Sequence, residues 1–141
     1  MSLYHTNEGR FELPDDWVDR TLHVFAPSNS PDAEWNIVVS RDKLPDGEGL
    51  NDYVTRQLGE MPKALRQFKM MRDEETTLDG VPAREVETTW LGESGTLRQR
   101  QVVAVHRDRA IVFTLTVLDY RYSQHAHVLD DMLADFQFRR N

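Results

Sequence analysis

The sequence contains no cysteine, and this absence removes several kinds of chemistry at once. Without a thiol the chain can form no disulfide, cysteine nucleophile, zinc ribbon or iron–sulfur cluster. It also lacks an apolar run of the roughly 20 residues that a transmembrane helix needs. Its first residues do not pair a basic segment with an apolar one, as a signal peptide does. We therefore expect a cytoplasmic protein that does not insert stably into a membrane.

The chain also lacks an excess of basic residues. Its 17 Lys and Arg are outnumbered by 24 Asp and Glu, which gives a net charge of −7. Because neutralising phosphates requires an excess of Lys and Arg, we do not expect nucleic acid as a partner. What the sequence does have is length and apolar content for a core, with 141 residues of which 39% are hydrophobic. A single domain over residues 1–141 is the natural expectation.

Motifs of catalysis are missing as well. His125 and His127 stand two apart in a predicted helix, so they point to nearly opposite sides and cannot share a metal ion. There is no glycine-rich phosphate loop, and Ser94, with Gly92 and Gly95 beside it, falls in a predicted hairpin turn. We expect no catalytic residue, no metal site and no cofactor, and a binding protein rather than an enzyme.

Most of the chain alternates apolar and polar residues at the period of a β-strand. Strands are predicted over residues 21–26, 35–41, 81–91, 97–106 and 110–118. Residues 92–95 and 108–109 supply the turns of two hairpins, so the second half reads as an antiparallel meander. Residues 73–75, all acidic, indicate a charged strand or loop, and residues 27–32 indicate a loop.

Two segments follow the helical period instead. The first covers residues 50–67 and contains Pro62, which should kink the helix or begin a new one. The second covers residues 123–136, with Ser123 as its N-cap. The order of strands, helix, meander and helix predicts an α+β fold, a curved antiparallel sheet with flanking helices packed against it.

Several polar side chains fall on otherwise apolar faces. Gln99 and Gln101 share the more apolar face of their strand, and Gln57 lies on the apolar stripe of the first helix. Asn36 and Ser40 flank Val38 on one face of another strand. Any one of these groups could simply sit at the edge of the core with a backbone partner. Together they also fit a half-apolar groove with spaced amides, which suits a mostly apolar partner such as a helix held in water.

The order of several short segments resembles a known family. Residues 4–21 resemble the start of the DcrB-related proteins that act as Eag chaperones of type VI secretion. The similarity continues along the chain through residues 36–41, 53–58, 78–84 and 98–101. Each segment is weakly specific, and their combined order is more so. Within the opening motif, Phe11, Leu13 and Trp17 are expected to belong to the core.

The resemblance implies a PsbP-like fold and a homodimer without enzymatic activity. Such a protein would bind the N-terminal transmembrane helices of a secreted toxin, upstream of its PAAR domain, and shield them in the cytoplasm. It would also help to load the toxin onto the secretion spike. The family binds these helices on a concave apolar face that carries glutamines. The matching positions here are Leu22, Val24, Asn36, Val38, Ser40, Gln57, Leu65 and Gln101.

Other hypotheses remain open at this point. The second is a carrier of a small apolar ligand, with a pocket lined by Trp35, Trp90 or Phe113; a closed cavity would favour it, and an open groove would favour the chaperone. The third is a hydrolase, which would need a convergent cluster drawn from three distant residues. Those residues are His106, Asp108 and Glu87. A fourth, a periplasmic relative of the same fold, conflicts with the missing signal peptide.

Overall fold

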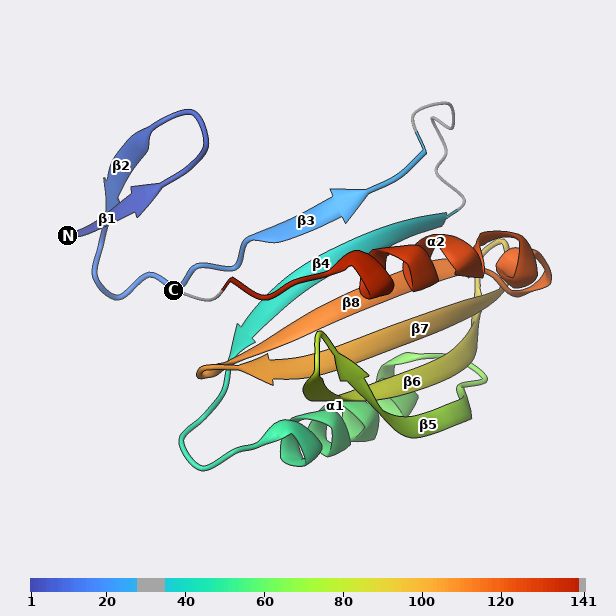
Figure 1. Ribbon diagram of the computed structural model, residues 1–141. Helices are drawn as coiled ribbons and strands as arrows, with labels where there is room; N and C mark the ends of the chain where they lie inside the picture. Colours follow the sequence, from blue (N-terminus) through green and yellow to red (C-terminus); the bar gives the residue numbers. More distant parts are fainter. Residues whose placement is uncertain (28–34, 140–141) are drawn as a thin grey trace.

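The computed structural model describes residues 1–27 and 35–139, and its centre is an antiparallel sheet of six strands. The strands lie in the order β3-β4-β8-β7-β6-β5 (Figure 1). Their bounds are β3 Leu22–Phe25, β4 Trp35–Lys43, β5 Lys69–Leu78, β6 Val81–Gly92, β7 Gly95–His106 and β8 Arg109–Leu118. Together with two helices the sheet forms the expected α+β fold. The loop expected over residues 27–32 lies, from residue 28 onward, outside the described residues.

The second half of the chain is the predicted meander, with one strand added. Gly92 pairs with Gly95 at the β6–β7 turn, as expected. His106 pairs with Arg109, which places the β7–β8 turn one residue earlier than the sequence indicated. The acidic residues 73–75 belong to β5, an edge strand with almost all of its side chains exposed. Charged residues suit a sheet edge, because they keep its open backbone groups from pairing with other chains.

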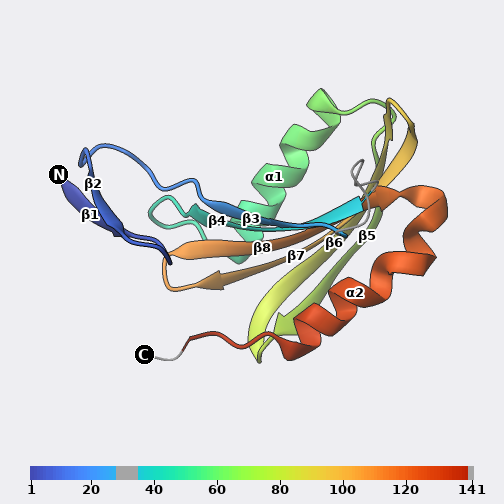
Figure 2. The same cartoon turned by 90° about the horizontal axis from the view of Figure 1, so that it is seen from above.

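Two helices lie on opposite faces of the sheet (Figure 2). Helix α1 spans Leu50–Ala64 and α2 spans Tyr122–Asp135, each within a few residues of its expected range. Helix α1 runs past Pro62 and ends two residues later, so no new helix begins there. Ser123 is not the N-cap of α2: a 3₁₀ turn over Asp119–Arg121 leads directly into this helix, whose N-cap is Arg121.

The alternation of each strand divides the core into two layers. On the α2 side, Leu129 of α2 and Phe138 beyond it pack on Ile37, Val102 and Leu115 of the sheet. On the α1 side, the core residues belong to helix and sheet and to the loop between them. They are Leu44, Tyr53, Val54, Val86, Val103, Ala110 and Val112. Helix α1 is fixed to β4 by the Tyr53 hydroxyl, which donates to Asp42 Oδ2 at 2.9 Å.

The N-terminal hairpin stands away from the six-stranded sheet in both views (Figures 1 and 2). It consists of β1 (Ser2–His5) and β2 (Arg10–Leu13), which form a two-stranded sheet of their own among the described residues. The expectation that Phe11 and Trp17 are core residues is therefore wrong, since they are 47% and 66% exposed. Phe11 instead contacts the ring of Tyr4, with centroids 5.5 Å apart. Among the described residues, no helix has the length and apolar character to cross a membrane.

Candidate partner-binding face

The predicted binding residues gather on the α1 side of the sheet. The register links Val24 to Val38, Val38 to Thr114 and Thr114 to Gln101, which makes one row across four strands. Directly opposite residues of an antiparallel sheet point to the same face. Since Gln101 in turn pairs with Val86 of the α1-side core, the whole row lies on that side. Two residues of the predicted set on β3 and β4 thus share a face with the glutamine on β7.

Two parallel rows hold the other strand residues of the set. Leu22 pairs with Ser40, and Ser40 pairs with Val112 of the α1-side core. Asn36 pairs with Thr116, and Thr116 pairs with Gln99. All six predicted positions on strands are therefore brought to one face, and Gln99 joins them.

Gln57 and Gln101 come from α1 and β7 and meet at a small cavity between helix and sheet. Its volume is about 30 Å³, and its other walls include Val54 and Val112. Such a volume holds about one water molecule. Gln101 also donates to the Thr114 hydroxyl at 3.3 Å, and Gln99 donates to that of Thr116 at 3.4 Å. The amides therefore have side-chain partners on the neighbouring strand, which the strand pattern alone did not reveal.

Leu65 lies at the end of α1 rather than on the sheet. It is the C-cap residue, half-buried, and its N–H donates to the Met61 carbonyl at 3.0 Å. The predicted set therefore extends from the exposed edge strand β3 to the C-terminal end of α1. Neither Leu65 nor Gln57 belongs to a row of the sheet, and Gln57 is placed beside Gln101 by the cavity between α1 and the sheet.

The edge strand β3 is exposed along its whole length. Leu22 and Val24 are 53% and 57% exposed on the α1 side, and Phe25 is 53% exposed on the opposite side. Fully burying one such side chain is worth about 1.5–3 kcal/mol. Several neighbouring apolar side chains left in solvent, rather than one, are typical of a surface that a partner covers.

The opposite face holds a network of charges under α2. Arg98 donates to Glu87 at 2.6 Å, and Arg100 donates to Glu85 at 2.9 Å and to Asp130 of α2 at 2.6 Å. Burial alone would raise the pKa of the Glu87 carboxyl, but hydrogen bonds from Arg98 and Tyr122 hold that pKa below its usual range. Burial and the same carboxylate raise the pKa of Tyr122 to about 12. These groups pair with one another and fasten α2 to the sheet.

An apolar groove lies between β3 and α2, also on the face away from α1. It has a volume of about 330 Å³ and is lined by Phe25, Ala26, Pro27, Trp35, Ile37, Val128 and Met132. Of the three residues expected to line a ligand pocket, Trp35 alone contributes here. Phe113 is packed in the core, and Trp90 falls in the register row of Leu97 on the α1 side.

The residues proposed for a hydrolase do not converge. Glu87 pairs with Arg100, and His106 stands six residues further along β7, at ~3.3 Å per residue, or about 20 Å away. His106 stacks on Phe138 with ring centroids 4.5 Å apart, and His125 stacks on Trp35 at 4.3 Å. Across residues 1–27 and 35–139, no group of three or more His, Asp or Glu side chains is arranged to hold a metal ion.

Sequence comparison places these features in a family. The sequence model of the DcrB family matches residues 8–135. The protein named Effector EagT6 from Pseudomonas aeruginosa is 33% identical over 117 residues, which is 82% of this chain and 81% of that protein.

Solved structures with a similar fold include one from the same organism as this relative. The crystal structure of PA94 from Pseudomonas aeruginosa, described as a protein of unknown function and putative regulator, has a TM-score of 0.82 at 29% identity, covering 100% of this chain and 99% of its own. Cyanobacterial PsbP from Synechocystis sp. PCC 6803 has a TM-score of 0.55 at 16% identity, covering 94% and 88%. This second likeness shows the fold alone, and it confirms the PsbP-like architecture. The chain belongs to the DcrB family, as the resemblance to Eag chaperones implied.

Proposed function

We propose that this chain is a cytoplasmic chaperone of type VI secretion. It binds the N-terminal transmembrane helices of a PAAR-containing effector, shields them from water and aids their loading onto the secretion spike. It acts as a homodimer and catalyses no reaction. Membership of the DcrB family and the similarity to Effector EagT6 support a role beside a secreted effector.

The observation that carries the proposal is the exposed apolar edge of the α1 face. Leu22 and Val24 are more than half exposed, and the row behind Val24 passes through Val38 to Gln101. A transmembrane helix presents about 20 apolar residues that water excludes, and it gains free energy wherever such a surface covers it. The face offers this cover along the exposed strand β3.

The polar groups on the same face serve orientation. A net hydrogen bond between neutral groups is worth about 0.5–1.5 kcal/mol, less than the burial of one large apolar side chain. The amides of Gln57 and Gln101 therefore add little to bulk affinity. They penalise any register in which a client helix leaves them without a partner, and this penalty selects one orientation.

The test compares the two sides of β3. An effector segment carrying two apolar helices is co-expressed with the wild-type chain, with Leu22→Arg or with Phe25→Arg. The soluble complex is then captured, and its amount and molecular mass are measured. Leu22 and Phe25 are both 53% exposed but point to opposite faces, so Phe25→Arg is a matched control. We expect Leu22→Arg to abolish the complex and Phe25→Arg to retain it.

Three results would decide against the chaperone or its placement. Loss of the complex with Phe25→Arg alone would move the binding surface to the α2 side. Retention with both variants would remove β3 from the interface. Failure of the wild-type chain to keep any cognate segment soluble would reject the function itself. The mass of the complex, measured by light scattering, tests the homodimer, because one client bound to one protomer would contradict it.

The groove between β3 and α2 is open, which fits the chaperone better than a ligand carrier, but the character of its lining supports a second candidate, a carrier of a small apolar ligand. Its lining is almost wholly apolar, as such sites are. Native mass spectrometry of the purified protein after incubation with a medium-chain fatty acid would test this. Binding that Phe25→Arg removes and Leu22→Arg preserves would support the carrier, and no bound lipid would count against it.

A further inference from the structure

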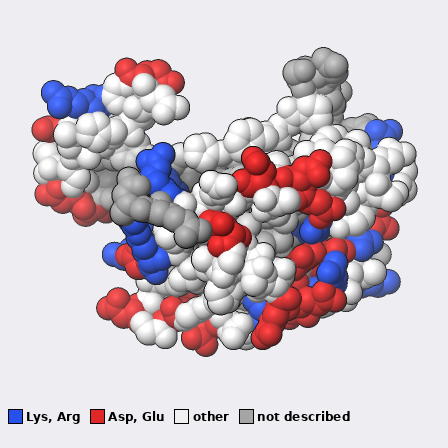
Figure 3. All heavy atoms as spheres, in the orientation of Figure 1, with Lys and Arg blue, Asp and Glu red and all other residues white. Residues whose placement is uncertain are grey.

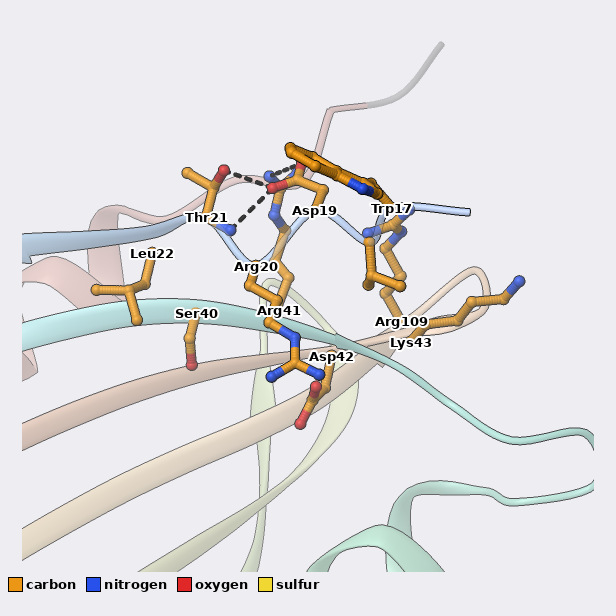
Figure 4. A pocket seen from close by; sticks show the side chains of 11 residues that line it. Trp17, Asp19, Arg20, Thr21, Leu22, Ser40, Arg41, Asp42, Lys43 and Arg109 are labelled. Atoms are coloured by element: carbon orange, nitrogen blue, oxygen red, sulfur yellow. Dashed lines mark hydrogen bonds and ion pairs between the residues drawn. The ribbon is translucent and has the colours of Figure 1, made fainter. Parts of the chain in front are cut away.

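A second surface lies where the sheet meets the segment that leads into β3. There, residues 17–22 cross above the ends of β4 and β8 (Figure 4). A pocket of about 710 Å³ lies between this segment and the two strands. Its lining includes four cationic side chains, Arg20, Arg41, Lys43 and Arg109, and two carboxylates, those of Asp19 and Asp42. The local excess of positive charge contrasts with the net charge of −7 for the whole chain.

Both carboxylates of the pocket are already engaged. Asp19 accepts hydrogen bonds from the backbone and hydroxyl of Thr21 and from the Tyr4 hydroxyl, and these hold its pKa below the usual range. Asp42 accepts the hydroxyl of Tyr53. Of the four cations, Arg41 alone has an ion pair within the described part of the chain, with its guanidinium 3.7 Å from Asp19.

The cations are also placed against one another. Lys43 is the register partner of Arg109, so the two like charges stand directly opposite on neighbouring strands. Such a cross-strand pair is destabilising by itself. Arg41 is two residues before Lys43 and therefore points to the same face. An anion bound among these side chains would offset a repulsion that the residues described here leave uncompensated.

The basic atoms form a visible cluster on the surface. Figure 3 shows one group of basic atoms at the junction between the N-terminal hairpin and the six-stranded sheet; other basic atoms lie on the hairpin and, among acidic atoms, at the opposite end of the molecule. In Figure 4, Lys43 extends outward at the rim and Trp17 lies above the pocket. Trp17 and Val18 are 66% and 71% exposed, so the rim adds apolar surface to the positive charge.

The pocket is continuous with the partner-binding face. Leu22 and Ser40 line it, and both belong to the set predicted to contact the client. A client helix lying along β3 and β4 would therefore reach the pocket where its apolar stretch passes Leu22. The next residues of that client would turn around the edge of β4, beside the indole of Trp17, to reach Arg41, Lys43 and Arg109, which the register places on the α2 face.

We propose that this pocket, formed by Arg20, Arg41, Lys43 and Arg109 beneath Trp17, binds a carboxylate-rich flank of the same client that places its apolar helix on the α1 face. The inference rests on the proposed function. Complementary charge contributes to choosing the client and its direction more than to total affinity, since exposed ion pairs are individually weak. The chain would thereby select apolar segments that carry Asp or Glu at one end.

The test uses three co-expressed client segments with one apolar helix pair and different flanks. Three Glu, three Gln or three Lys residues stand at each end of the segment. Each is captured with the wild-type chain, with Arg109→Gln and with a control, Lys69→Gln, which removes one exposed charge from β5 at the other sheet edge. We expect the wild-type chain and the control to retain about tenfold more Glu-flanked than Lys-flanked client at 50 mM salt. The difference should shrink to about twofold at 500 mM salt.

Stability separates loss of the site from loss of the fold. Because Arg109→Gln relieves the repulsion with Lys43, its melting temperature should be no lower than that of the wild-type chain. It should nevertheless show a smaller preference for the Glu-flanked over the Lys-flanked client than the wild-type chain does. Lys43→Gln, an exposed position, should behave in the same way.

Each remaining result overturns the inference in an identifiable way. Equal recovery of all three clients by the wild-type chain would reject the acidic flank and leave the chaperone intact. If Arg109→Gln and Lys43→Gln both recover the Glu-flanked client in the same excess over the Lys-flanked client as the wild-type chain does, the selecting charges lie elsewhere. Recovery of no client by the wild-type chain would reject the proposed function, and the inference with it.

Discussion

Gln57 and Gln101, from α1 and β7, face one cavity of about 30 Å³ beneath the helix. Their amides lie at the packed part of the α1 face, from which the same rows continue to half-buried residues of β4 and exposed residues of β3. A polar pair at such a boundary lets helix α1 close the core on one side while the other side stays available to a partner. This juxtaposition joins the stability of the fold to the proposed recognition of a client.

Replacing Gln101 by Ala separates these two roles. The change removes the hydrogen bond to Thr114 and should lower the free energy of unfolding by only about 1 kcal/mol. Urea denaturation of the variant and of the wild-type chain measures this cost. Gln99→Ala is the matched control, because it removes the equivalent bond to Thr116 on the same face but outside the cavity that Gln57 and Gln101 line. A loss above about 3 kcal/mol would mean that Gln101 is a core residue rather than a boundary residue.

Leu129→Ala should loosen α2 from the sheet. The side chain is fully buried against the core of the α2 face, and removing a buried leucine costs about 2–5 kcal/mol through lost burial and the cavity left behind. Thermal or urea unfolding gives the value directly. Tyr120→Ala, next to the same helix but 71% exposed, should change stability by less than about 0.5 kcal/mol. Equal effects of the two changes would contradict the packing described here.

Because the pKa of the Glu87 carboxyl is lowered in the folded state, we expect the stability of the fold to depend on pH. Its folded-state pKa is lower than that of the unfolded chain, because Arg98 and Tyr122 bind the ionised form despite its burial. A group with a depressed pKa stabilises the fold above the unfolded pKa of about 4.3, and this contribution is lost as pH falls through the folded value. Urea unfolding between pH 7 and pH 3 should therefore show decreasing stability.

In Glu87→Gln, part of that acid sensitivity should disappear. The variant should also be less stable than the wild-type chain by roughly 1–3 kcal/mol at pH 7, because the half-buried Arg98 and Tyr122 lose a charged partner. Glu75→Gln, on the exposed strand β5, gives the comparison for a carboxylate without such contacts. Parallel pH profiles for the wild-type chain and Glu87→Gln would refute the assignment.

Removing residues 2–13 should leave the six-stranded sheet intact. Within residues 1–27 and 35–139 the hairpin pairs only with itself, and the side-chain hydrogen bonds that link it to the rest of the chain reach only Asp15, Asp19 and Thr21. Melting followed by circular dichroism should shift by no more than a few degrees. A collapse of stability would show that the hairpin supports the sheet. Light scattering on the same sample reports whether the hairpin is needed for the expected homodimer.

The sequence predicted the strands of the meander and both helices because their patterns are local. Alternation at period two from Val81 to Leu118 fixes which side chains share a face, and a shift of one residue would turn the core outward. The same alternation placed Asn36, Val38 and Ser40 on one side. It missed β1, β2 and the full extent of β5, because short or charged edge strands bury too little to leave an apolar signature.

The local sequence pattern did not predict that Phe11 and Trp17 are exposed. Large aromatic residues are buried more often than not, and the sequence gives no sign that the hairpin carrying Phe11 stands apart from the sheet. Whether an apolar residue is buried depends on what packs over it, which is a long-range property. The exposure of Phe11, at 47%, follows from the pairing of β1 with β2 alone, and Trp17, 66% exposed, lies in the irregular segment between β2 and β3.

By itself, the sequence excluded cysteine chemistry and determined the fold class, the faces of the strands and the family. These follow from composition, from residue periodicity and from the order of short segments along the chain. The tertiary structure alone decided that Gln57 meets Gln101, and that Lys43 stands against Arg109. It also decided that Leu22 remains in solvent on a sheet edge. These relationships join residues tens of positions apart, and strand register and helix packing, rather than any local pattern, bring such residues together.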